Sequence, residues 1–279
     1  MRSRYKTTDK NGKMEEATNQ ERRLTIRIGR NTLAMLSLGE DGYMEYEPYV
    51  VKSGVSIAAN LRDAFKQSQL LQQAPPRVRV LLDSDVLMVP VELFSEQEME
   101  QLHHHAFPSG QQDAVYYNVL PDLNAVAVFS MNRDLRLVLD DHFHDIRLVS
   151  AVQPVWRYLH QRSFTGVRPK LYGYFHEKRL EVFAFLKNRF KFCNTFEAKR
   201  VNDALYFLLY VWNQLQLKAE FDELYLVGDI PAQDWLMTEL KRYLDKVYVI
   251  NPSGDFSQHP VTTVKGMPYD LQTLVVKGR

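Results

Sequence analysis

The densest cluster of metal-ligand side chains lies in the segment Asp140–Asp145, which contains three aspartates and two histidines. In an extended stretch, His142 and His144 would point to the same side, with Asp140 beside them. Imidazole and carboxylate groups in such a set suit Zn²⁺ or another divalent ion. The segment equally suits a polar loop between a helix and a strand. We therefore expect no metal, and keep Asp140, His142 and His144 as the candidates.

Other side chains that could do chemistry lack the partners that chemistry needs. His103, His104 and His105 end a predicted helix, where cationic imidazoles favour the helix dipole, and adjacent residues point in different directions. Cys193 is the single cysteine and has no evident histidine partner, so we interpret it as a small buried side chain in a strand. An intrachain disulfide is excluded, which fits a reducing compartment and predicts a cytoplasmic protein.

An enzyme would need carboxylates that converge in a cleft. These carboxylates would come from outside the standard motifs of a known enzyme class, and Asp83, Asp85 and Asp229 are the candidates. No complete catalytic motif accompanies them, so we expect no catalytic residue.

Composition narrows the classes of partner. The 279 residues are 45% hydrophobic and 25% charged, which fits a globular protein with a sizeable core. The net charge of +1 gives no long-range attraction to nucleic acid or to anionic membranes. The most apolar run, Ala204–Trp212, is much shorter than the roughly 20 residues of a membrane span. We expect no nucleic acid, no membrane insertion, and a flexible polar tail over residues 1–20.

Periodicity predicts an α/β chain with two similar halves, residues 21–153 and 170–279, joined by a connecting helix and linker over 154–169. In the first half we predict strands at 24–28, 33–38, 43–51, 77–82, 86–91, 115–120, 125–129 and 146–149, with helices at 56–67, 95–105 and 132–139. In the second we predict strands at 171–175, 180–186, 190–196, 223–227 and 247–250, with helices at 198–217, 231–244 and 269–276.

Each half therefore has the order β-β-β-α-β-α-β, with an extra hairpin in the first. The opening meander implies antiparallel pairing, and the later β-α-β steps imply parallel strands with right-handed crossovers. A mixed sheet covered by helices follows for each half.

Three glycine-containing or turn segments follow strands in these halves: Ile26–Thr32, Tyr172–Arg179 and Leu224–Asp229. With the doubled element order, they give the chain a resemblance to the actin-like ATPase (ribonuclease H-like) fold, shared by actin, sugar kinases and heat-shock chaperone ATPase domains. More closely, the chain from about Leu24 onwards resembles a bacterial family of unknown function in that superfamily. The resemblance implies a nucleotide cleft between the halves.

The resemblance also shows that the first phosphate motif is degenerate. The superfamily motif is a strand that ends in Asp-x-Gly-Thr/Ser. Gly29 matches the glycine, but Arg27 stands at the metal-organising aspartate and Arg30 at the hydroxyl. A guanidinium offers no lone pair to Mg²⁺, although it could hold a phosphate directly. Alternatively, Arg27 is a solvent-facing strand residue between core isoleucines.

The other two motifs are degenerate as well. The segment Tyr172–Arg179 has no Asp-x-Gly, and aromatic side chains replace the small residues of a phosphate hairpin. In the adenosine motif, Gly228 keeps the first glycine and Asp229 replaces the second, with a helix N-terminus near Pro231 that would attract anions. Alternatively, Gly228 only permits a β-α turn.

Aromatic side chains are frequent in the second half. They include Tyr172, Tyr174, Phe175, Phe183, Phe185, Phe190, Phe192 and Phe196. With nearby lysines and arginines they could stack on single-stranded nucleic acid, but their alternation favours the packed face of a hairpin.

We therefore predict an actin-like protein that is non-catalytic and acts as a protein-binding or assembly module. The alternative is a protein that binds or senses a nucleotide or phosphometabolite in the cleft without hydrolysis, through Arg27, Gly29, Arg30, Gly228 and Asp229. We expect no cofactor in the first case, and ATP or another nucleotide in the second.

Overall fold

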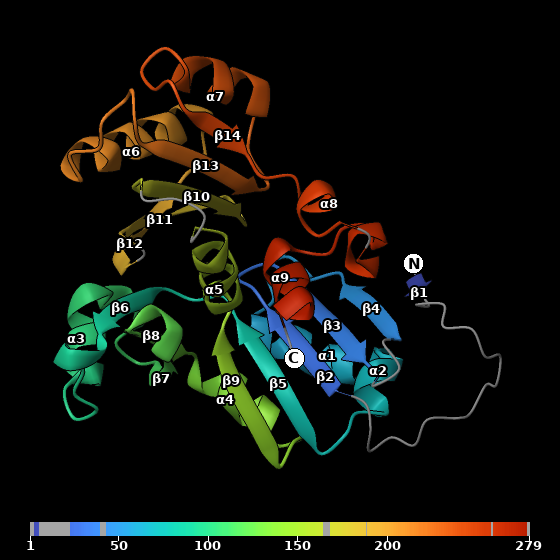
Figure 1. The fold of residues 1–279 in the computed structure, drawn as a ribbon. Coiled ribbons are helices and arrows are strands. Elements are labelled where there is room, and N and C mark those ends of the chain that lie inside the picture. Colours follow the sequence, from blue (N-terminus) through green and yellow to red (C-terminus); the bar gives the residue numbers. More distant parts are fainter. Residues whose placement is uncertain are drawn as a thin grey trace.

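Two sheets that share a five-strand order organise the molecule, and the first has one further edge strand (Figure 1). The computed structural model describes residues 3–5, 23–39, 43–163, 168–187, 189–257 and 259–277. The first sheet has the order β1-β4-β3-β2-β5-β9. Its strands are β1 (Ser3–Tyr5), β2 (Arg23–Ile28), β3 (Leu33–Leu38), β4 (Met44–Tyr49), β5 (Arg77–Leu82) and β9 (Asp145–Ser150). Strands β2, β3 and β4 form an antiparallel meander, and β5 and β9 run parallel to β2.

The second sheet repeats this arrangement with the order β12-β11-β10-β13-β14. Its strands are β10 (Lys170–His176), β11 (Arg179–Leu186), β12 (Arg189–Glu197), β13 (Glu223–Gly228) and β14 (Val247–Val249). The first three form an antiparallel meander, and β13 and β14 are parallel to β10. The predicted mixed sheets are therefore confirmed in both halves.

An inserted unit separates β5 from β9. It contains β6 (Val86–Pro90), β7 (Ala114–Leu120) and β8 (Ala125–Met131) in the antiparallel order β6-β8-β7, with α3 (Met99–Ala106) against it. The predicted helix start at Ser95 is wrong, because Ser95 closes a turn with the backbone N–H of Glu98 and the helix begins at Met99.

Helices cover the sheets on both sides (Figure 1). They are α1 (Ile57–Gln67), α2 (Gln69–Gln72), α4 (Arg133–Asp140), α5 (Val152–Ser163), α6 (Val201–Gln214), α7 (Gln233–Leu240), α8 (Pro252–Asp255) and α9 (Tyr269–Lys277). Four 3-10 turns are η1 (Val91–Leu93), η2 (Pro108–Gly110), η3 (Pro121–Leu123) and η4 (Pro260–Thr263). In Figure 1, α6 and α7 lie on the outer side of the second sheet, while α5 lies between the two sheets.

Burial on both faces explains an unexpected feature of β2. The apolar residues Leu24, Ile26 and Ile28 are buried, as their alternation predicts, but Thr25 and Arg27 on the opposite face are also only 2% exposed. The reason is that helices cover both faces of this sheet. The interpretation of Arg27 as a solvent-facing strand residue is therefore wrong.

The C-terminal segment returns to the first half. Helix α9 packs on α5, and Phe256, Val261 and Leu271 belong to the same apolar cluster as Ile26 and Leu36 of the first sheet. At the other end, Ser3–Tyr5 of the expected flexible tail forms β1, antiparallel to β4, and the rest of that tail lies outside the described residues.

Candidate functional site

Arg27 lies at the centre of a buried ionic cluster between the two halves. Its Nε donates to both carboxylate oxygens of Asp270, at 2.9 and 3.0 Å, and its NH2 lies 2.8 Å from one of them. Its NH1 donates to Glu177 at 2.9 Å and to the hydroxyl of Thr32 at 2.6 Å, while NH2 lies 3.6 Å from Asp83. Arg27 therefore meets three carboxylates, from the residue after β5, the β10–β11 turn and α9.

Glu177 places a carboxylate on the turn where the resemblance expects a phosphate. Its Oε2 accepts from the backbone N–H of Asn31 at 3.0 Å, and its Oε1 accepts from the Thr32 hydroxyl and from Arg27. A Cβ on Gly29 would lie 1.8 Å from Glu177 Oε1. Glycine is therefore required at this position for the carboxylate to approach the backbone, and an internal anion occupies the first phosphate turn.

A second layer of charges joins the halves beside Arg27. Asp83 contacts His176 Nδ1 at 3.0 Å and Arg179 NH1 at 3.3 Å. Arg179 also pairs with Asp85, which receives Arg30 NH2 at 3.0 Å. Acidic groups from the first half thus meet cationic groups from the second hairpin, and each buried charge has an opposite charge next to it.

Burial and neighbours shift the proton affinities within this layer. Burial raises the pKa of Asp83, but the adjacent His176, Arg27 and Arg179 outweigh it and hold that pKa well below its usual range. For His176, burial lowers the pKa, while Asp83 and Glu181 raise it and prevail. For Glu181 the effect of burial prevails over that of its neighbours and raises the pKa to about 7.

Glu181 extends the cluster towards α5. Its Oε1 accepts from Trp156 Nε1 at 2.5 Å, and its Oε2 lies 3.9 Å from His176 Nε2. The Cys193 thiol lies 3.7 Å from Glu181 Oε1, and burial raises the pKa of that thiol well above its ordinary value. Cys193 is thus held as a neutral thiol, in agreement with its interpretation as a structural side chain.

The predicted nucleotide-site residues separate into two cavities. Arg27, Gly228 and Asp229 line a cavity of about 290 Å³ between the halves. Gly29 and Arg30 line a different cavity of about 250 Å³ within the first half. The five residues do not all line one cavity, although Arg27 and Gly29 both lie against Glu177, which lines the cavity between the halves.

The backbone conformation of the turn after β13 requires glycine at position 228. Gly228 has φ +92°, and a Cβ there would lie 2.1 Å from the backbone oxygen of Phe175. The N–H of Asp229 donates to that same oxygen at 2.9 Å, and the Asp229 side chain is exposed. Gly228 thus ties β13 to the end of β10, which is the turn function that we kept as its alternative interpretation.

The candidate carboxylates of an enzyme do not converge either. Asp83 and Asp85 line the 250 Å³ cavity, whereas Asp229 lines the cavity between the halves. Both Asp83 and Asp85 are already paired with guanidinium groups.

The candidate metal ligands also have other roles. Asp140 pairs with Arg136, and the His142 ring stacks on Phe65 while its Nδ1 lies 2.8 Å from the Val138 oxygen. Within the described ranges, no group of three or more histidine, cysteine, aspartate or glutamate side chains is arranged to hold a metal ion. Asp140, His142 and His144 are therefore not brought together.

The second-half aromatics form packed surfaces. Tyr172, Tyr174, Phe175, Phe183 and Phe185 are each at most 2% exposed. Trp156 of α5 packs against Phe183 and Phe190, which joins the second sheet to the connecting helix. The prediction that the hairpin aromatics pack in the core is confirmed for these residues, with Phe175 on the opposite face of the sheet from the other four.

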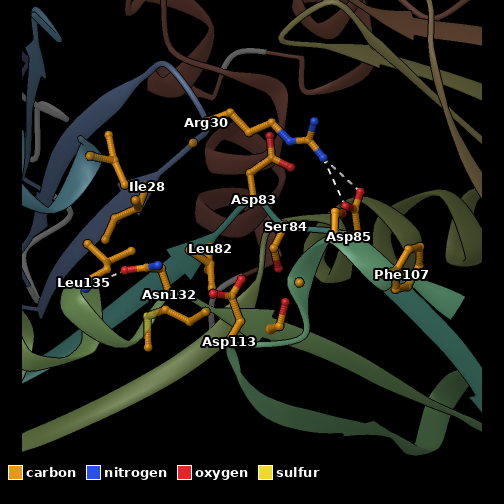
Figure 2. Close-up of a pocket in the computed structure, with 16 residues that line it drawn as sticks. Ile28, Arg30, Leu82, Asp83, Ser84, Asp85, Phe107, Asp113, Asn132 and Leu135 are labelled. Carbon is orange, nitrogen blue, oxygen red and sulfur yellow. Dashed lines mark hydrogen bonds and ion pairs between the residues drawn. The ribbon is translucent and has the colours of Figure 1, made fainter. Parts of the chain in front are cut away.

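The 250 Å³ cavity lies where the first sheet meets the inserted unit (Figure 2). The carboxyl ends of β2 and β5 form one wall, and η2, β8 and the start of α4 form the other. In Figure 2, Ser84 and Asp113 project towards one another from opposite walls. This is the position, beyond the carboxyl ends of parallel strands, where α/β proteins commonly bind ligands.

Sequence comparison places the chain in a family. The model of a protein family described as protein of unknown function (DUF3822) matches residues 11–247. The chain belongs to this family. No curated protein matches the sequence. The predicted membership of a family of unknown function is confirmed, and the fold described above is the fold of a DUF3822 member.

Solved structures give the same fold class. A Bacteroides thetaiotaomicron protein with an actin-like ATPase fold and unknown function is 26% identical, with a TM-score of 0.82 over 95% of this chain and 99% of that chain. A chain of the PilM–PilN type IV pilus biogenesis complex is 14% identical, with a TM-score of 0.53 over 92% of this chain and 98% of that one. The predicted actin-like fold is confirmed.

Two findings concern residues that the sequence interpretation did not select. Glu177 and Asp270, the two closest acidic partners of Arg27, stand in a turn and in the first turn of α9. The signal for Glu177 was its place at the second phosphate hairpin, whereas nothing in the pattern around Asp270 indicates its partner.

Across the described ranges, no helix is both long and apolar enough to cross a membrane.

Proposed function

We propose that this DUF3822 protein is a non-catalytic actin-like module that binds a protein partner. The observation that carries the non-catalytic part is the Arg27 cluster. A guanidinium takes the place of the metal-organising aspartate, and its positive charge is satisfied by Asp270 and Glu177 rather than by a phosphate. Hydrolysis by the superfamily's motifs would require Mg²⁺ beside a buried cation.

The outer face of α6 supports the protein-binding part. Fourteen consecutive residues, from Ala204 to Leu217, contain no charge. Tyr206 and Tyr210 are 61% and 46% exposed on this helix, and their rings stack. Exposed tyrosine without neighbouring lysine or glutamate is the composition of interface cores rather than of ordinary surface. The PilM–PilN complex is a precedent for the same fold within a protein assembly.

The second candidate function, nucleotide or phosphometabolite binding without hydrolysis, is supported by the 290 Å³ cavity beside Gly228. It would require Glu177 to leave the turn at Gly29, because that carboxylate already takes the N–H of Asn31. We therefore rank it second.

Turnover of ATP with Mg²⁺ by the purified protein tests the non-catalytic part. We expect no turnover above that of buffer. The non-catalytic assignment would be contradicted by a measurable rate of ATP turnover that Gln272→Leu in the interdomain cavity abolishes and the exposed control Glu100→Gln keeps. A thermal-shift panel of nucleotides tests the second candidate, and a shift that Gln272→Leu removes would favour that candidate instead.

Capture of partners tests the binding part. Photo-crosslinking in cells of the source species, with the wild-type chain and a Tyr206→Lys/Tyr210→Lys variant, should yield a defined protein that only the wild type captures. Tyr248→Lys is the matched control, since Tyr248 is 44% exposed on another element. Equal capture by all three chains would refute the assignment of α6, and capture of nothing specific would refute the binding module.

A further inference from the structure

The cavity of Figure 2 contains polar groups that the fold leaves without partners. Among the carboxylates that line it, Asp83 and Asp85 are ion-paired, but Asp113 has no ion pair or side-chain hydrogen bond within the described part of the chain. The Ser84 hydroxyl is buried and has no hydrogen-bond partner there. Ser130, which also lines the cavity, is 7% exposed, and none of the hydrogen bonds found among the described residues involves its hydroxyl.

Two of these oxygens lie close to the same point beside Gly110. Asp113 Oδ2 and Ser130 Oγ lie 3.7 and 3.6 Å from the position that a Cβ on Gly110 would occupy. Ser84 projects towards Asp113 from the opposite wall (Figure 2). The cavity therefore offers one unpaired carboxylate and two unpaired hydroxyls to a single guest, and such acceptors favour a hydrogen-bond donor that carries positive charge.

An anion is the less favourable guest, although two helices begin at this cavity. Side chains already cap the first turn of each helix and compete with an anion for its N–H groups. Ser56 caps α1 through the N–H of Ala59, and Asn132 caps α4 through the N–H groups of Asp134 and Leu135. An anion would also meet the unpaired charge of Asp113.

The other residues that line the cavity favour an organic cation over a metal ion. Ile57, Leu82, Phe107, Met131 and Leu135 give the cavity an apolar floor and one aromatic wall. Methylene groups would bury against such a lining, and an aromatic face attracts a cation. The volume of about 250 Å³ is just below the usual range of small-molecule sites, so a short chain fits and a nucleotide does not.

We propose that this cavity binds an ammonium or guanidinium group on a short aliphatic stem, with Asp113 as its counter-ion and Ser84 and Ser130 as hydrogen-bond acceptors. A lysine or arginine side chain and a free diamine share this chemistry. The inference does not depend on the proposed partner surface on α6, which lies in the other half of the molecule.

Calorimetric titration of the full chain tests the proposal with three probes. N-acetyl-lysine amide carries the cation, N-acetyl-norleucine amide has the same apolar stem without it, and 1,4-diaminobutane is the free diamine. We expect the lysine probe or the diamine to bind, and the norleucine probe to bind at least about tenfold more weakly. A stronger signal from the lysine probe identifies a protein side chain as the source, and a stronger signal from the diamine identifies a small molecule.

Two variants locate the site. Asp113→Asn should lower the affinity for the cationic probe about tenfold or more, because it removes the counter-ion. Ser130→Ala should lower that affinity less. Both variants should keep the wild-type melting temperature, since neither side chain has an internal partner. Glu100→Gln, an exposed change on α3, is the charge-matched control. No binding of either cation, equal binding of the norleucine probe, or wild-type affinity in Asp113→Asn would overturn the proposal.

Discussion

The guanidinium of Arg27 donates from Nε to both carboxylate oxygens of Asp270, two residues that stand 243 positions apart in the chain. Both side chains are at most 2% exposed. This pair ties β2 of the first sheet to the last described helix, α9. The energy of such a buried pair is small relative to two apolar residues, but removing one partner leaves an uncompensated buried charge.

Asp270→Asn should therefore destabilise the protein strongly. We expect the free energy of unfolding to fall by about 3–5 kcal/mol, because Arg27 loses the partner that holds two of its nitrogens. Urea denaturation followed by circular dichroism measures this change. The matched control is Arg77→Ala, which breaks an exposed pair with Asp145 and should cost less than about 1 kcal/mol. Similar losses in both variants would show that the cluster does not hold the halves together.

The raised pKa of Glu181 predicts a pH dependence of stability. Its carboxyl stays protonated in the folded chain up to about pH 7, whereas in the unfolded chain it ionises above roughly pH 4.3. Between these values the unfolded state binds fewer protons than the folded state, so stability falls as pH rises. The raised pKa of His176 acts in the same direction, because its contribution is lost as pH rises through that pKa.

Glu181→Gln should remove the part of this dependence that belongs to Glu181. We expect wild type and variant to have similar stability near pH 5, and the variant to be more stable by about 1–3 kcal/mol at pH 8. Urea denaturation at pH 5, 6, 7 and 8 measures both curves. Glu100→Gln should follow the wild type throughout, and parallel curves for Glu181→Gln and wild type would refute the assignment.

The turns at Gly29 and Gly228 should respond differently to an added methyl group. Gly228→Ala places Cβ against the backbone of Phe175 at positive φ, so we expect a loss of more than about 2 kcal/mol. Gly29→Ala meets the end of the Glu177 side chain instead, which can move at the cost of its hydrogen bonds, about 1–2 kcal/mol.

A double variant separates these two causes. Adding Glu177→Ala should recover part of the loss in Gly29→Ala and none of the loss in Gly228→Ala, as thermal denaturation would show. Gly254→Ala is the control, because no atom lies within 4 Å of its Cβ position, and it should not destabilise. Additive losses in the Gly29/Glu177 pair would contradict the close approach of that carboxylate.

The return of α9 predicts that the first half depends on the end of the chain. Leu271 of α9 is 0% exposed within the core cluster of the first sheet. Leu271→Ala should cost about 2–5 kcal/mol and expose β2 and β3 to hydrogen exchange together with α9. Leu137→Ala, at a 57% exposed leucine of α4, should cost less than about 1 kcal/mol. Exchange confined to α9 would show that the helix is only an appendage.

The sequence predicted the secondary-structure elements better than it predicted which distant residues lie in contact. Strict alternation placed β2 and β3 closely, and Ser56 and Asn132 marked the starts of α1 and α4, because these signals act within a few residues. The burial of Arg27 was missed, because it depends on a second layer of helices that alternation within one strand does not reveal.

Long-range pairing explains the rest of what was missed. Glu177 lies 150 residues from Arg27, and Asp270 lies further still. Each stands in a short segment whose own pattern is that of an ordinary turn or helix start. The resemblance to actin-like proteins placed the correct turns opposite each other, but the replacement of a phosphate by the carboxylate of Glu177 required the packed structure.

The separation of Arg27 from Asp270 also has a consequence during protein synthesis. The ribosome produces the first sheet, with its arginine at a position that ends up buried, long before it produces the carboxylate that neutralises it. A nascent chain that ends anywhere before α9 therefore has no complete counter-charge for that arginine. Burial of Arg27 with all of its acidic partners in place is thereby coupled to translation of α9.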